Sequence, residues 1–166
     1  ASAVLTSTSG ITLDAGTNAV AESVLDLDNG TIKGDITVNK GTIKVGSNFT
    51  LKSSDGTSAG TILLDGSDQT AANAVLANDA GSAKSLADAI LSIKNGTVTA
   101  TNNLTVGTVK AALDSSSLVL STNAESLIAG TIDVSEGDLI ISQTSNNATT
   151  VKVESTGEFG KGTGTV

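Results

Sequence analysis

The stretch "NGTIKGDITVNKGTIKV", residues 29–45, contains Gly-Thr-Ile-Lys twice, the second time eleven positions after the first. A related stretch, "NGTVTATNNLTVGTVKA", occupies residues 95–111. Apolar and polar residues alternate in both, which is the two-residue period of a half-buried β-strand. A glycine precedes the Thr-Ile pairs that begin at Thr31 and Thr42 and the Thr-Val pairs that begin at Thr97 and Thr108. This pattern predicts a chain that turns at the glycine and begins a strand at the threonine.

The same signals recur along most of the chain. Short alternating runs such as "FTLKS", "SLVLS" and "TTVKVES" are rich in Val, Ile, Leu and Thr. The Gly-Thr-Ile/Val corner occurs at Gly30, Gly41, Gly60, Gly96, Gly107 and Gly130. Dipeptides that favour turns stand between the runs, at Asn29-Gly30, Asp55-Gly56, Asp65-Gly66, Asn95-Gly96 and Glu136-Gly137. We therefore expect many short strands joined by tight corners.

The chain also shows internal similarity at a longer spacing. Residues 22–32 match residues 88–98 at an offset of 66, and the offset grows further along the chain. We interpret this as two tandem copies of about seventy residues, with insertions in turns. We therefore expect internal repeats at about 22–66 and 88–137 within a single all-β domain that covers residues 1–166.

An Ala-rich region, residues 69–93, departs from the strand pattern. Apolar residues at its end follow helical spacing, which allows a short helix. Residues 89–93 align with a strand-like segment of the first copy, so we predict a strand there and leave 70–86 open.

Two folds fit many short strands with Gly, Asn and Asp corners. The first is a β-solenoid of the parallel β-helix kind, in which each turn of chain stacks on the one before. The alternative is an antiparallel β-sandwich or jelly roll. Uniformly short strands, small aliphatic core residues and the recurring corner favour the solenoid. The intervals between successive Gly-Thr corners differ, so they predict no single turn length, and this counts against the solenoid.

Composition excludes several classes of function. The net charge is −8 and the nine lysines are scattered, so the chain lacks the cationic clusters that nucleic-acid binding requires. No apolar run is long enough for a membrane-spanning helix, so we expect no membrane insertion. Cys and His are absent, which removes the Ser-His-Asp and Cys-His forms of catalysis. We predict that the chain is not an enzyme.

The repeats in residues 24–66 and 90–154 resemble the passenger repeats of bacterial autotransporters and filamentous-haemagglutinin-type adhesins. They are also similar to the shaft segments of phage tail fibres. This resemblance rests on the Gly-Thr-Ile/Val and Asn-Gly elements, and it implies an extracellular, cell-surface protein with a structural or adhesive role.

Acidic turns are the candidate metal sites, because calcium binds carboxylate and carbonyl oxygens from loops. "DGSD" and "DVSEGD" supply the candidate calcium ligands Asp65, Asp68, Asp133 and Asp138. No other cofactor is expected. Asn-x-Ser/Thr sequons, the acceptors for N-glycosylation, occur at Asn29, Asn48, Asn95, Asn103 and Asn147.

These patterns lead to a functional hypothesis. We expect a self-assembling subunit of a surface filament or sheath, or an adhesin shaft, in which copies of the chain form a homopolymer. Residues 1–13 and 160–166 are apolar and poor in charge, so they are candidate joining segments. The alternative is an adhesin or phage-fibre module that binds glycans or a host surface.

Overall fold

The computed structural model describes most of the chain. The described residues are 4–14, 24–65, 73–78, 86–94, 97–100, 103–113, 115–121, 126–143, 150–153, 159–161 and 165–166. Within them, no helix has the length and apolar character needed to span a membrane.

The described residues form fourteen β-strands and no helix. The strands are β1 (Val4–Thr6), β2 (Ile11–Asp14), β3 (Val24–Lys33), β4 (Ile36–Lys52), β5 (Thr61–Asp65), β6 (Asn73–Asn78), β7 (Leu86–Lys94), β8 (Thr97–Ala100), β9 (Leu104–Leu113), β10 (Ser115–Leu120), β11 (Ser126–Asp133), β12 (Asp138–Gln143), β13 (Thr150–Val153) and β14 (Phe159–Lys161).

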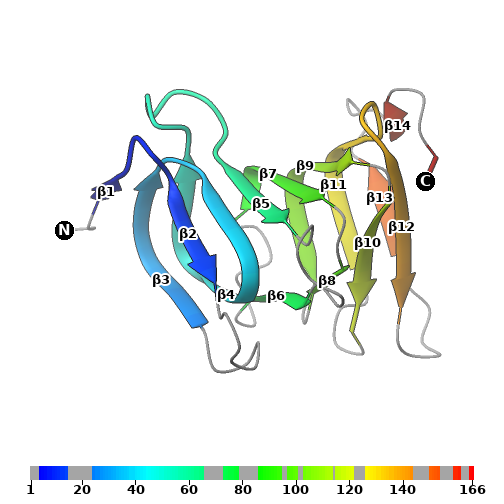
Figure 1. Cartoon of the computed structure of the whole chain (residues 1–166), viewed down its shortest axis with the longest axis horizontal. Helices are drawn as coiled ribbons and strands as arrows, with labels where there is room; N and C mark the ends of the chain where they lie inside the picture. Colours follow the sequence, from blue (N-terminus) through cyan, green and yellow to red (C-terminus); the bar gives the residue numbers. More distant parts are fainter. Residues whose placement is uncertain are drawn as a thin grey trace.

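The strands stack as a β-solenoid along the longest axis of the molecule, from β1 and β2 at one end to β12, β13 and β14 at the other (Figure 1). Sheet A runs β1–β3–β4–β6–β8–β10–β12. Sheet B runs β2–β4–β5–β7–β9–β11, and β11 pairs with both β13 and β14. The chain alternates between the sheets, and the long strand β4 belongs to both.

The strand pairing decides between the two predicted folds. Every described strand pair is parallel, and the one isolated antiparallel bridge joins Lys52 and Ala59 beside the loop after β4. A sandwich built from hairpins requires antiparallel neighbours. The prediction of an all-β solenoid is confirmed, and the sandwich alternative is wrong.

The repeating unit in space is one turn of the solenoid. Thr108 lies beside Thr131, twenty-three positions later, whereas Ile90 lies beside Thr108, eighteen positions later. The turn length therefore varies, because loops of different size join strands that keep the same register. The residues matched at an offset of 66 lie in different sheets: Leu25 pairs with Ile43 in sheet A, and Leu91 pairs with Ile62 in sheet B.

Inward-facing aliphatic residues stack in columns and make the core. One column in sheet B reads, strand after strand, Ile11, Ile36, Ile62, Leu91, Val109 and Ile132. The side chains of Ile36, Ile62, Leu91, Val109 and Ile132 are buried. Because each column needs one residue of similar width per turn, a core of Ile, Val, Leu and Ala suits this narrow interior.

Three of the Gly-Thr corners lie in one column. The residues that follow them are in register, since Thr61, Ile90, Thr108 and Thr131 are successive partners in sheet B. The corner itself brings backbones very close: a methyl group at Gly130 would lie 2.5 Å from the carbonyl oxygen of Gly107. Glycine is required because the stacked corners leave no room for a side chain.

The other predicted corners take different places. Gly41 lies where β4 passes from sheet B to sheet A, and Gly30 lies within β3, opposite Phe49. The Asp55-Gly56 turn is confirmed by a hydrogen bond from the Gly56 N–H to the Ser53 carbonyl. A bend at Glu136-Gly137 joins β11 to β12. Gly66 and the dipeptide Asn95-Gly96 lie outside the described residues.

The Ala-rich region is strand wherever it is described. Residues 89–93 lie in β7, so that prediction is confirmed. Part of the open segment 70–86 forms β6, which pairs with β4 and β8. The register of the neighbouring strands overrides the helical tendency of alanine there.

Candidate interface at the two ends of the solenoid

The exposed large apolar residues of the described chain lie in the first and last turns of the stack. Val4, Leu5 and Val24 belong to β1 and β3 at one end, here called the N-end. Ile140, Val151 and Val166 lie in or next to β12 and β13 at the other, here called the C-end. Soluble proteins expose scattered apolar residues routinely, but a set confined to two opposite ends is informative.

Two of these residues are the open ends of core columns. Leu5 is 54% exposed, whereas its partner Ile32 in the next strand is 5% exposed. At the C-end, Val151 is 41% exposed, whereas its partner Leu127 is fully buried. Their exposure follows from position, since no described turn of the solenoid covers them.

Among the described residues, the edge strands at both ends also lack a strand partner on one side. At the N-end, β1 covers only Thr31–Lys33 of β3, and residues 24–27 have β4 as their only described strand partner. At the C-end, β12 has β10 as its only described strand partner. An edge strand presents N–H and C=O groups that another strand can pair with.

The edge strands differ in charge between the two ends. The N-end edge, made of β1, β2 and residues 24–27, contains Asp14 and Asp26 and no lysine. The C-end edge contains Lys152 in β13, Lys161 in β14 and Asp138 in β12. These charges are read from the sequence of the strands, and Asp26 is paired with Lys44 at 3.3 Å.

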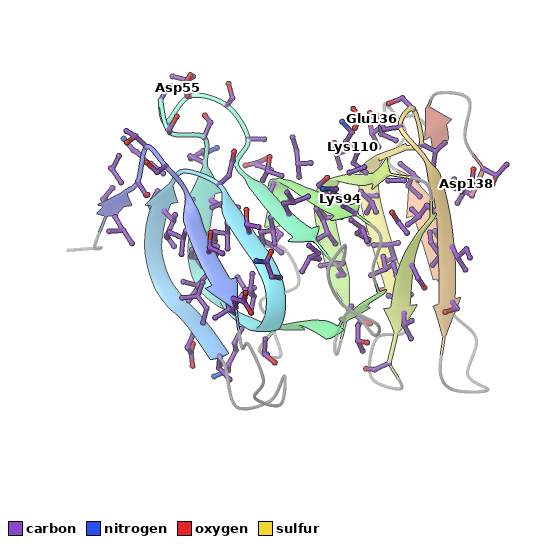
Figure 2. The ribbon with its side chains drawn as sticks, viewed as in Figure 1. Asp55, Lys94, Lys110, Glu136 and Asp138 are labelled. Atoms are coloured by element: carbon purple, nitrogen blue, oxygen red, sulfur yellow. The ribbon has the colours of Figure 1, made fainter. Side chains whose placement is uncertain are left out.

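Asp138 contacts residues near the chain end. Its Oδ1 atom accepts a hydrogen bond from the Thr165 N–H at 2.7 Å, and the Leu139 N–H donates to the Thr165 carbonyl at 2.8 Å. The hydrogen bonds from the backbone and side chain of Thr165 hold the pKa of Asp138 below its ordinary value of 3.8. Figure 2 shows Asp138 at the C-end of the stack. In the described structure, the Asp138 carboxylate therefore holds residue 165 next to β12.

The other predicted calcium ligands do not form a described cluster. Asp133 Oδ1 accepts hydrogen bonds from the Ser135 N–H at 2.9 Å and the Ser135 hydroxyl at 2.6 Å. In the ladder of sheet B, Asp133 stands between Lys110 and Lys161. Asp65 ends β5, with its side chain outside the description, and Asp68 lies outside the described residues.

Acidic groups elsewhere in the described chain are engaged with nearby donors. No group of three or more His, Cys, Asp or Glu side chains that could hold a metal ion occurs among the described residues. Lys110 forms an ion pair with Glu136, and Lys44 pairs with Asp26 at 3.3 Å. Figure 2 shows Lys110 and Glu136 beside each other. The calcium site remains a prediction.

A polar pocket of about 280 Å³ lies near the N-end. Ser7, Ser9, Thr37 and Ser54 line it, together with Asp35. The Asp35 Oδ1 atom accepts a hydrogen bond from the Thr61 N–H at 3.0 Å. Hydroxyl groups and a carboxylate can exchange hydrogen bonds with a polar ligand, although no aromatic ring lines the pocket.

The predicted sequons are only partly described. Asn103 is exposed at the start of β9, and its side-chain oxygen accepts a hydrogen bond from the Ser126 N–H at 3.1 Å. Asn29 and Asn48 are partners in the ladder between β3 and β4, with side chains outside the description. Asn95 and Asn147 lie outside the described residues.

The stacked parallel strands make this protein a parallel β-solenoid. Comparisons with protein-family models, with curated proteins and with solved structures each found no match. The argument about function therefore depends on this chain's own residues.

Proposed function

We propose that this chain is an extracellular structural protein whose solenoid units associate end to end into a filament, a sheath or the shaft of an adhesin. The observation that carries the proposal is the exposure of Leu5 and Val151, which are the two uncovered ends of otherwise buried columns. Burying one large aliphatic side chain is worth about 1.5–3 kcal/mol. Contact between the N-end and the C-end would bury both sets at once.

The direction of association follows from the parallel strands. When all strands run the same way, adding a C-end below an N-end continues the parallel ladder of both sheets. Such a contact joins two different surfaces, so it leaves a free N-end and a free C-end and can propagate.

The extracellular part of the proposal is supported by the resemblance of the repeats to bacterial surface adhesins and phage-fibre shafts. Calcium remains a proposed optional ligand of the acidic turns. A structural role also fits the described residues, since they form one continuous stack of parallel strands.

Electron microscopy of the purified chain, with and without calcium, tests the proposal. We expect rods longer than one molecule, and we expect Leu5→Lys to abolish them because it places a charge on the exposed column end of every copy. Thr105→Lys is the matched control, since it adds the same charge on the outer face of a middle strand. Dispersed single molecules under all conditions would contradict the proposal.

A second candidate is a glycan-binding module, and the hydroxyl-lined pocket favours it. A glycan array would show retention of specific sugars by the wild-type chain, and Asp35→Ala would reduce it. Asp55→Ala is the control because Asp55 is an exposed carboxylate outside the lining of that pocket. Absence of binding to any sugar on the array would contradict a glycan-binding function.

A further inference from the structure

The C-end carries a contact that the N-end lacks among the described residues. Thr165 lies beside the beginning of β12 and exchanges two hydrogen bonds with it, one through the Asp138 carboxylate and one through the Leu139 N–H. Because the Leu139 N–H donates to Thr165 and not to β10, this amide lies on the edge of β12 that faces away from β10. Residues 165–166 thus occupy part of an edge that would otherwise be open.

The alternating direction of the N–H groups along a strand shows how much of the β12 edge Thr165 occupies. Successive amides of a strand point to opposite neighbours, so the N–H groups of Ile141 and Gln143 lie on the same side as that of Leu139. Thr165 accepts from Leu139, the first of these three. The rest of the β12 edge has no described strand partner.

The order of strands in sheet A identifies what would pair there. At the N-end, residues 24–27 are the uncovered segment of sheet A, and at the C-end β12 is its last strand. If turns continue across a contact between two copies, Val24–Leu27 of the second copy lies against β12. Two segments then compete to pair with the same edge of β12, namely residues 165–166 of the same chain and β3 of the next copy.

We infer that residues 165–166 are a self-cap that competes with the next copy for the edge of β12, with the Asp138–Thr165 contact holding the cap in place. This inference rests on the proposed end-to-end association. It makes the C-end the regulated end, because docking there requires displacement of the cap, whereas no such contact covers the N-end strands among the described residues. The self-cap acts as other edge-blocking devices do, by satisfying hydrogen-bonding groups that would otherwise recruit a neighbouring chain.

Two variants release the cap by different routes. Asp138→Ala removes the acceptor of the Thr165 N–H, and Thr165→Pro removes the donor. Asp138→Asn is the matched control, because its side-chain oxygen can still accept the bond. Loss of one net hydrogen bond should raise the association constant about fivefold in both release variants. Sedimentation velocity measures association, and hydrogen exchange at the Leu139 amide measures whether the cap has opened.

The outcomes separate this inference from the proposed function. Faster exchange at Leu139 together with stronger association, in both release variants and not in Asp138→Asn, supports the self-cap. Faster exchange with weaker or unchanged association, in a wild-type chain that does associate, overturns the self-cap and leaves the proposed function standing. If the wild-type and released chains all remain monomeric at every concentration, the self-cap and the proposed function both fail.

Discussion

The middle turns and the end turns of this solenoid use the same kinds of residue and reach different states. In the middle, Leu127 is fully buried because a strand covers it on each side. At the ends, Leu5 and Val151 occupy the same kind of inward position and remain about half exposed. The comparison teaches that burial in a solenoid depends on neighbours along the stack, and that an end is an unfinished core.

The largest expected effect compares truncation in the middle with truncation at an end. Leu127→Ala should destabilise the fold by about 2–5 kcal/mol, because it leaves a cavity in a closed column. Leu5→Ala should cost less than about 1 kcal/mol in the monomer, because water already reaches that side chain. Urea denaturation followed by circular dichroism measures both. Equal losses would contradict the distinction between middle and end.

The stacked glycines should be the next most sensitive feature of the middle turns. A methyl group at Gly130 would approach the Gly107 carbonyl oxygen to 2.5 Å, so Gly130→Ala must displace backbone. We expect a loss of roughly 1–3 kcal/mol. Thr131→Ala, one position further along β11, is the control and should cost less. Thermal unfolding of both variants would show the difference, and a Gly130→Ala chain as stable as wild type would rule out the close-packed corner.

A buried hydroxyl adds a smaller contribution inside the stack. Ser116 is buried and donates a hydrogen bond to the Ile93 carbonyl at 2.6 Å, linking β10 to β7. Ser116→Ala should cost about 1 kcal/mol, since the carbonyl loses that donor in a dry interior. The neighbouring Ser117→Ala, on the outer face, should be close to neutral. A reversed order of these two stabilities would show that Ser116 lies elsewhere.

The smallest effect is expected in the exposed loop after β4. The Ser53 hydroxyl and the Thr57 N–H donate to Asp55 and hold its pKa below the ordinary value of 3.8. A carboxylate with a lowered folded pKa stabilises the fold above its unfolded pKa and loses this contribution as the pH falls through the folded value. The advantage of wild type over Asp55→Ala should therefore be constant above about pH 5 and shrink below it. A melting-temperature difference that grows on acidification would contradict the assignment.

The sequence predicted the repeating features of the fold better than the single contacts. Alternation around Ile43 and Val109 indicated strands with one buried face, and the Gly-Thr pairs at Gly60, Gly107 and Gly130 indicated corners that do stack. The equivalence of Leu25 with Leu91 in the repeat alignment did not predict their neighbours, because similar residue types serve in both sheets. Register depends on loop lengths and packing, which local patterns do not contain.

Only part of the candidate interface could be predicted from the sequence. Residues 1–13 were predicted as a joining segment and include Leu5, whereas Val151 lies in an ordinary-looking strand. Nothing in "TVKV" indicates that β11 is the only described strand partner of β13. Asp138 was selected as an acidic turn residue, and its hydrogen bond to Thr165 joins positions twenty-seven apart. No local signal connects such distant residues, so the contact required the three-dimensional arrangement.

The most direct test mixes two chains, each blocked at one end. Leu5→Lys blocks the N-end and Val151→Lys blocks the C-end. If association joins an N-end to a C-end, each variant alone should sediment as a monomer, because every contact needs one N-end and one C-end and one of the two is blocked in every copy. An equimolar mixture should give a capped dimer and nothing larger, whereas wild type gives longer species. Dimers of either variant alone, or a mixture that stays monomeric while wild type assembles, would contradict end-to-end association of these two surfaces.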